Sequence, residues 1–167
     1  MIERMGAAFC ADQLAHHPRL LKTHFSWANC PKNSKEQLVK FIFVARNPKD
    51  CLVSFFHHHR NFRCYQWAQG AFDVFFELFV AGRLDFGDYF DHLLGWLPHL
   101  DEANVLFLKY EEMLADLEGA IRGIGTFLGG NAQKMVESES KFAEIVAASR
   151  FDAMQSKQEQ FFPPNAL

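Results

Sequence analysis

The sequence predicts an α/β fold in which a mostly parallel sheet is flanked by helices. Three short apolar segments, residues 19–24, 41–45 and 105–108, have the composition of strands. The last two read as buried strands, because they are apolar on both faces, as central strands of parallel sheets are. Amphipathic helices are expected between and after them, and this alternation is typical of parallel sheets. Three strands are few for such a fold, so we expect the sheet to be incomplete.

The clearest strand, residues 41–45, is expected to lead directly into a helix. Asn47 suits the N-cap position of a helix and Pro48 suits its first turn, so we predict a helix from Pro48 to about Asn61. Apolar side chains at helical spacing predict further helices over residues 72–80, 89–97 and 117–128, and two short ones up to about residue 150. A helical turn is expected over residues 34–37, and a loop over residues 155–167.

Composition places the chain among folded, soluble proteins. It has 167 residues, which suits one domain, and 49% of them are hydrophobic, so it can bury a core. The net charge of −3 argues against binding to nucleic acids or anionic membranes through bulk electrostatics. No apolar run approaches the ~20 residues of a membrane span, and no signal peptide follows Met1. We therefore predict a cytoplasmic protein with neither nucleic acid nor membrane as a partner.

Cysteine and histidine patterns give no support for a metal site. The cysteines have no CxxC spacing and are expected to be reduced thiols; they are Cys10, Cys30, Cys51 and Cys64. His57, His58 and His59 are consecutive on the predicted helix. Successive helical side chains point about 100° apart, so these three cannot face one ion. We predict no metal.

The first predicted strand ends in Lys22, Thr23 and His24. Because strand side chains alternate, Lys22 and His24 would point the same way at one edge of the sheet. Histidine is the commonest general base near neutral pH, and lysine can neutralise charge on a leaving oxygen. Taken alone, this short motif is better explained as a surface lysine beside a solvated histidine, because short motifs often match by chance.

The other two strands end in Arg46 and in Tyr110. Arg46 precedes a capped helix start, and both an arginine and a helix N-terminus favour a phosphate. Tyr110 could line the plane of a ligand. The alternatives are an ion pair of Arg46 with Asp50 or another acid, and a partly buried core tyrosine at position 110.

Taken together, several motifs resemble the central part of the cytosolic sulfotransferases. They are RLLKTH at residues 19–24, FVARNPKD at residues 43–50 with Ser54, residues 86–87, residues 92–96, and VLFLKYEEM at residues 105–113. Their order and spacing agree over about residues 19–130, which is more specific than any one motif. The resemblance implies an incomplete P-loop-NTPase-like parallel sheet.

The resemblance also implies an activity. It implies transfer of a sulfuryl group from 3′-phosphoadenosine 5′-phosphosulfate to a small-molecule phenol, alcohol or amine, without a metal. His24 looks like the family's catalytic base, and Lys22 like the lysine that steadies the transferring group. Such a transfer is an in-line displacement that depends on positioning and charge stabilisation.

Four residues resemble the family's nucleotide contacts. Arg46 and Ser54 look like the pair that holds the 3′-phosphate, and Tyr110 sits where the family contacts adenine. Phe142 resembles, more loosely, the aromatic residue that stacks on the adenine ring. These assignments are expectations that follow from the resemblance.

The family's pattern is matched only in part. Its phosphosulfate-binding loop, its C-terminal 3′-phosphate segment and its C-terminal dimerisation segment have no match, so we expect a single partial sulfotransferase domain over residues 1–167. A homodimer is expected for the full-length protein. Alternatives are an inactive truncated fragment that retains weak 3′-phosphoadenosine binding, and a helical interaction protein without a ligand.

Overall fold

The computed structural model describes residues 20–31 and 39–157 of the chain. It contains two compact units, Met1–Pro31 and Lys32–Leu167. The helical turn expected at residues 34–37 lies outside the described residues.

The described part of the first unit contains a short 3₁₀ helix, η2 (Trp27–Asn29), and no strand. The strand predicted over residues 19–24 is therefore wrong for its described residues, and the side chain of Leu20 is 85% exposed. The Thr23 hydroxyl accepts a hydrogen bond from the Phe25 N–H at 3.0 Å. Such local side-chain bonds compete with strand pairing, and a strand persists only where its backbone finds a neighbour.

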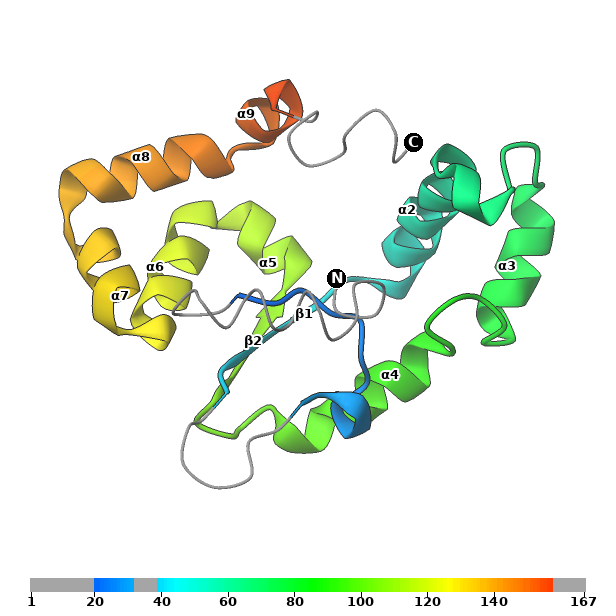
Figure 1. Ribbon diagram of the computed structural model, residues 1–167, viewed down its shortest axis with the longest axis horizontal. Coiled ribbons are helices and arrows are strands. Elements are labelled where there is room, and N and C mark those ends of the chain that lie inside the picture. The colour runs from blue at the N-terminus through cyan, green and yellow to red at the C-terminus, as the bar shows by residue number, and fades with distance from the viewer. Residues whose placement is uncertain (1–19, 32–38, 158–167) are drawn as a thin grey trace. The chain divides into compact units, whose positions relative to one another are not determined.

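The second unit contains a parallel pair of strands, β1 (Phe41–Ala45) and β2 (Val105–Lys109). Their register runs from Phe41 opposite Val105 to Ala45 opposite Lys109 (Figure 1). Both strands, and the α/β class, were predicted correctly. The prediction that both faces of residues 41–45 are buried is wrong, because Phe43 is buried while Val44, on the opposite face, is 44% exposed.

Helix α2 (Pro48–Asn61) follows β1 with the predicted bounds. The Asn47 side chain caps it by accepting a hydrogen bond from the Lys49 N–H. The next elements are η3 (Arg63–Tyr65), α3 (Phe72–Val80), α4 (Tyr89–Trp96) and η4 (Leu97–His99). Of these, α3 matches its predicted bounds, and α4 tightens into the 3₁₀ turn η4 at Pro98.

Up to residue 157, where the described part ends, five helices follow β2: α5 (Tyr110–Ala115), α6 (Leu117–Leu128), α7 (Gly130–Glu137), α8 (Glu139–Ser149) and α9 (Phe151–Ser156). Helix α6 ends where predicted, at Gly129, which has a φ of 72°. Neither α5 nor α9 was predicted, and α9 includes Gln155, where a loop was expected to begin. None of the helices in the described ranges is both long and apolar enough to cross a bilayer.

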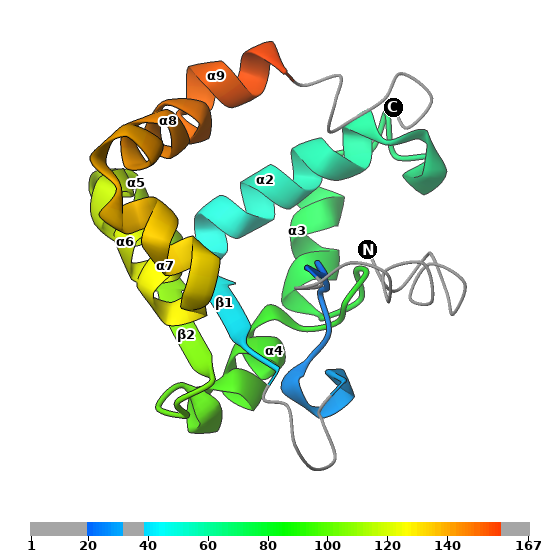
Figure 2. The same ribbon diagram turned by 60° about the vertical axis from the view of Figure 1, so that its left-hand side comes forward.

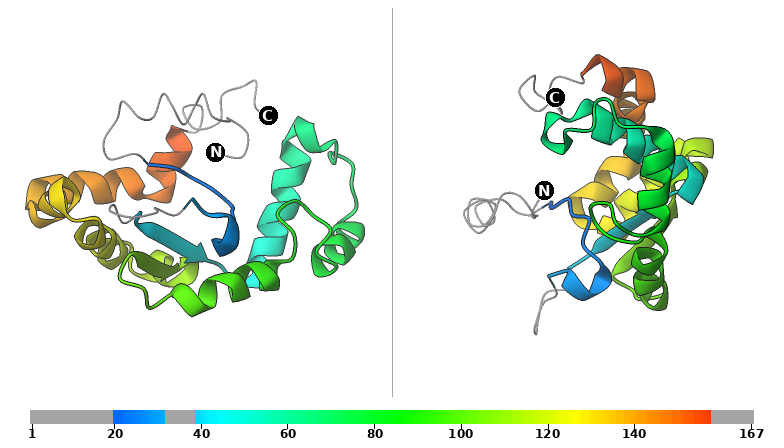
Figure 3. Two further views of the ribbon diagram at one scale, coloured as in Figure 1. Left: turned by 60° about the horizontal axis from the view of Figure 1, so that its bottom comes forward. Right: turned by 90° about the vertical axis from the view of Figure 1, so that its right-hand side faces the viewer.

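The helices of this unit lie on either side of the strand pair. Figures 1 and 2 show α6, α7 and α8 on one side and α2 and α3 on the other, and Figure 3 shows the same separation from below. On α4, Trp96 stacks on Phe43 with ring centroids 4.6 Å apart, which fixes this helix against β1. On the other side, the Lys40 ammonium donates to the last carbonyls of α6, at Phe127 and Leu128. These contacts hold β1 against α4 and against the end of α6.

Candidate functional site

The register of the two strands brings Arg46 and Tyr110 together. Ala45 and Lys109 are the last paired residues, so Arg46 and Tyr110 are the first residues beyond the carboxyl ends of neighbouring parallel strands. The Arg46 guanidinium lies over the Tyr110 ring, 4.6 Å from its centroid. This is the position at which open parallel sheets bind ligands.

Arg46 retains hydrogen-bonding capacity in this position. Its Nε is buried and has no hydrogen-bond partner among the described residues. Within those residues no carboxylate forms an ion pair with it, so the pairing with Asp50 considered above is not formed. A buried donor without a partner is costly, and a bound anion would remove that cost. The site therefore suits a phosphate group.

The backbone beneath Arg46 is held by side chains from two other helices. The Tyr89 hydroxyl, at the start of α4, donates a hydrogen bond of 2.5 Å to the Arg46 carbonyl. The Glu111 carboxylate, on α5, accepts one from the Asn47 N–H at 2.8 Å. Sequence reasoning missed both roles. A tyrosine within an apolar helical stripe does signal a hydroxyl that needs a partner, but nothing in the pattern pointed to position 46.

These contacts shift the pKa values of both side chains. The hydrogen bond from Asn47 holds the pKa of Glu111 below its ordinary value, helped by the nearby charges of Arg46 and Lys109. Burial raises the pKa of Tyr89, and the neighbouring Cys51 and Glu111 raise it further. At neutral pH Glu111 is therefore an acceptor and Tyr89 a donor, as their bonds require.

Ser54 lies on α2 with its side chain exposed. It is three residues after Cys51, a half-buried thiol whose pKa is raised by burial and lowered in part by the Arg46 charge. Residues three apart lie on the same face of a helix, so Ser54 shares a face of α2 with Cys51. The structure thus brings two of the predicted contacts, Arg46 and Tyr110, together at the end of the sheet. Ser54 lies further along α2, and its side chain forms no hydrogen bond with either of them in the described structure.

Lys22 and His24 belong to the first unit, and both are exposed. They flank Thr23, whose hydroxyl accepts a hydrogen bond from the Phe25 N–H. Their predicted side-by-side placement on a strand is not observed, because this segment is not a strand.

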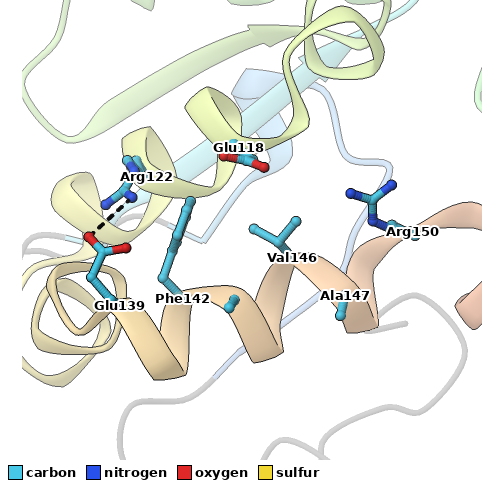
Figure 4. A pocket seen from close by; sticks show the side chains of 8 residues that line it. Glu118, Arg122, Glu139, Phe142, Val146, Ala147 and Arg150 are labelled. Atoms are coloured by element: carbon cyan, nitrogen blue, oxygen red, sulfur yellow. Dashed lines mark ion pairs between the residues drawn. The ribbon is translucent and has the colours of Figure 1, made fainter.

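Phe142 has a different environment from the other predicted residues. It lies on α8 in a small core with Val136 and Val146, and is only 4% exposed. The Arg122 guanidinium covers its ring at 3.6 Å from the centroid and also donates to the Val136 carbonyl. Figure 4 shows the two side chains together in a groove of about 340 Å³ between α6 and α8. A ligand ring could stack on Phe142 only after Arg122 had moved.

Comparison with known proteins shows what this chain is similar to. Residues 7–163 match the family model described as a sulfotransferase domain. Sulfotransferase 1C2 of Homo sapiens is 37% identical over 137 residues, which are 82% of this chain and 44% of that protein. The amine sulfotransferase of Oryctolagus cuniculus is 36% identical over the same shares of the two chains. The chain spans about half the length of the curated relatives it matches.

Solved structures share the fold described above. The crystal structure of mouse sulfotransferase SULT7A1 complexed with PAP has a TM-score of 0.63 and 37% identity, over 70% of this chain and 40% of that one. Retinol dehydratase in complex with androsterone and the inactive cofactor PAP has a TM-score of 0.64 and 32% identity, over 74% of this chain and 36% of that one.

Proposed function

Because this chain belongs to the sulfotransferase domain family, we propose that it transfers a sulfuryl group from 3′-phosphoadenosine 5′-phosphosulfate to a hydroxyl or amine of a small molecule. The observation that carries the proposal is the Arg46 guanidinium, stacked on Tyr110 beyond the ends of two parallel strands with its Nε unpartnered among the described residues. The similar structures with bound PAP support this choice of nucleotide.

The nucleotide would be held by Arg46, Ser54 and Tyr110. Arginine binds phosphate through a planar fork of donors, and the Ser54 hydroxyl would add a further donor to the 3′-phosphate. The Tyr110 ring, over which the Arg46 guanidinium lies, would contact the adenine. Phe142 does not enter the proposed site, because Arg122 covers its buried ring.

The chemical step would depend on His24 and Lys22. The acceptor oxygen attacks the sulfur while the His24 imidazole takes its proton, and the bond from sulfur to the bridging phosphate oxygen breaks. The Lys22 ammonium neutralises the charge that develops on that oxygen. General bases of this kind contribute about 10²- to 10⁴-fold to a rate. We propose that this takes place in the cytoplasm, with a phenol, an alcohol or an amine as acceptor.

The proposal is tested by sulfate transfer from the labelled donor to a panel of phenols, alcohols and amines. We expect the wild-type chain to transfer sulfate, and we expect His24→Ala to lower the rate of transfer by at least about 10²-fold. Transfer that His24→Ala leaves unchanged would remove the assigned base. Nucleotide binding without any transfer would favour the alternative, a chain that binds 3′-phosphoadenosine but is catalytically inactive.

A further inference from the structure

We propose that Tyr89 and Glu111 are positioning residues that fix the Arg46 side chain for the 3′-phosphate of the nucleotide. The inference rests on the proposed function, because it concerns the same phosphate. It adds two residues on two further helices, both of which bind the backbone next to the Arg46 side chain.

The two side chains hold the same peptide group from both ends. The Arg46 carbonyl and the Asn47 N–H belong to the peptide unit between these residues, and Tyr89 binds the first while Glu111 binds the second. A peptide unit is planar, so fixing both polar groups fixes the orientation of the plane. The orientation of this plane sets the backbone angle ψ of Arg46. It thereby sets the direction in which the Arg46 side chain leaves the sheet.

Glu111 supplies a bond that the helix does not provide for itself. Asn47 is the N-cap of α2, and the N–H of an N-cap has no partner within its own helix. In a capping box, a glutamate or glutamine at the third helical position takes this N–H. In α2 that position is Asp50, and it is Glu111 on α5 that accepts the bond.

Tyr89 is itself held in place. The Asp88 side chain caps α4 by accepting hydrogen bonds from the N–H groups of Phe90 and Asp91. The half-buried Tyr89 ring also packs near Phe79 and Phe90. Its hydroxyl is therefore a fixed point against which the end of β1 is set.

The arrangement leaves the guanidinium free for an anion. The Arg46 charge helps to lower the pKa of Glu111, yet the Glu111 carboxylate binds the Asn47 N–H and forms no ion pair with Arg46 in the described structure. The far end of the Arg46 side chain rests on Tyr110. A long arginine side chain loses rotamer freedom on binding, and a side chain fixed at both ends has lost part of that freedom beforehand.

The test compares two nucleotides by calorimetry with the full chain. Adenosine 3′,5′-bisphosphate contains the 3′-phosphate, whereas adenosine 5′-monophosphate lacks it. Tyr89→Phe removes one hydroxyl and is expected to weaken bisphosphate binding about fivefold, the loss of roughly one net hydrogen bond, while monophosphate binding stays unchanged. Glu111→Ala should behave in the same way.

Two glutamine variants separate the hydrogen bond from the charge. Glu111→Gln keeps an oxygen that can accept from Asn47, so it should retain bisphosphate affinity that Glu111→Ala loses. The matched control is Glu112→Gln, because Glu112 pairs with Lys109 and makes no contact with the Arg46–Asn47 peptide group. It should leave both affinities unchanged. Urea unfolding of each variant checks that it is folded.

The outcomes separate this inference from the proposed function. If the wild-type chain does not prefer the bisphosphate, the phosphate site itself is refuted, and the inference falls with it. Suppose that Arg46→Ala abolishes the preference for the bisphosphate, whereas Tyr89→Phe and Glu111→Ala keep it or weaken the binding of both nucleotides equally. In that case only the positioning role is refuted. In the Arg46→Ala background, Tyr89→Phe should have no further effect on the preference.

Discussion

His59 is a buried histidine on α2 that lies among aromatic rings. Its Nδ1 is 3.1 Å from the Phe55 carbonyl, and its ring stacks on Tyr65 with centroids 3.9 Å apart. Phe75, which is fully buried, closes the cluster. Burial lowers the pKa of His59, and this outweighs the Phe55 hydrogen bond and the Asp85 charge, which raise it.

We therefore predict that acid destabilises the protein through His59. Above the unfolded pKa of about 6.5, His59 is neutral in both states and has no effect on stability. As the pH falls below that value, the unfolded state binds the proton first, and the free energy of unfolding decreases until the pH reaches the lowered pKa of the folded state. Each unit of pKa difference corresponds to about 1.4 kcal/mol.

Urea unfolding between pH 7.5 and 5 measures this dependence. His59→Phe should flatten the profile, whereas His57→Phe, at an exposed position on the same helix, should leave it as in the wild type. A His59→Phe profile as steep as that of the wild type would show that other groups cause the acid sensitivity.

Single positions differed in how far the sequence revealed their roles. Arg46 and Tyr110 could be recognised because each follows an apolar strand, and parallel pairing then placed them side by side. Tyr89 could not be placed, because its bond to the Arg46 carbonyl joins residues that are 43 positions apart. Phe142 was expected to face a ligand, but an apolar helical position gives no sign of the arginine that covers it.

At the scale of elements, α6 and α7 depend on a close approach at Gly125. Gly125 is buried, and an added Cβ would lie 2.5 Å from a Val136 methyl carbon. Val136 belongs to the small core with Phe142 and Val146, so it has little room to move. Gly123, two residues earlier on the same helix, has nothing within 4 Å of such a Cβ.

The two glycines therefore predict opposite effects of the same substitution. Gly125→Ala should destabilise the protein by about 1–3 kcal/mol, because it overpacks the contact between the helices. Gly123→Ala should stabilise it by up to about 1 kcal/mol, because alanine favours the helix. Chemical denaturation at neutral pH gives both values, and equal effects of the two substitutions would contradict the packing described here.

Elements with strong local signals were predicted well. The bounds of α2 followed from Asn47 and Pro48, and the end of α6 followed from Gly129, which takes the positive φ that glycine tolerates. The described residues 20–24 do not form the predicted strand, since strand formation depends on a neighbouring strand that the segment's own composition cannot supply. The short α5 was missed, because six residues contain too few turns to show a helical period.

For the whole molecule, ligand binding and folding should be coupled. A ligand that binds only the folded state stabilises it, by about 2.7 kcal/mol at a concentration 100 times its Kd. We predict that adenosine 3′,5′-bisphosphate raises the thermal unfolding midpoint of the wild-type chain, and that Arg46→Ala removes most of this increase. An equal increase in both proteins would place the nucleotide away from Arg46.

The α/β class and the family were correctly predicted at this scale, because several motifs agreed in order and spacing. A single partial domain over residues 1–167, a homodimer and the choice of acceptor stay predictions. Such properties depend on surfaces and loops whose sequences carry no periodic signal, and long-range assembly cannot be inferred from local patterns.

We infer that the end of the parallel strand pair binds a nucleotide through Arg46. A crystal structure of the chain grown with adenosine 3′,5′-bisphosphate tests it most directly. We expect the 3′-phosphate within hydrogen-bond distance of the Arg46 guanidinium and the Ser54 hydroxyl, with the adenine beside Tyr110. A nucleotide bound elsewhere, with Arg46 still resting on Tyr110 and touching no phosphate, would contradict it.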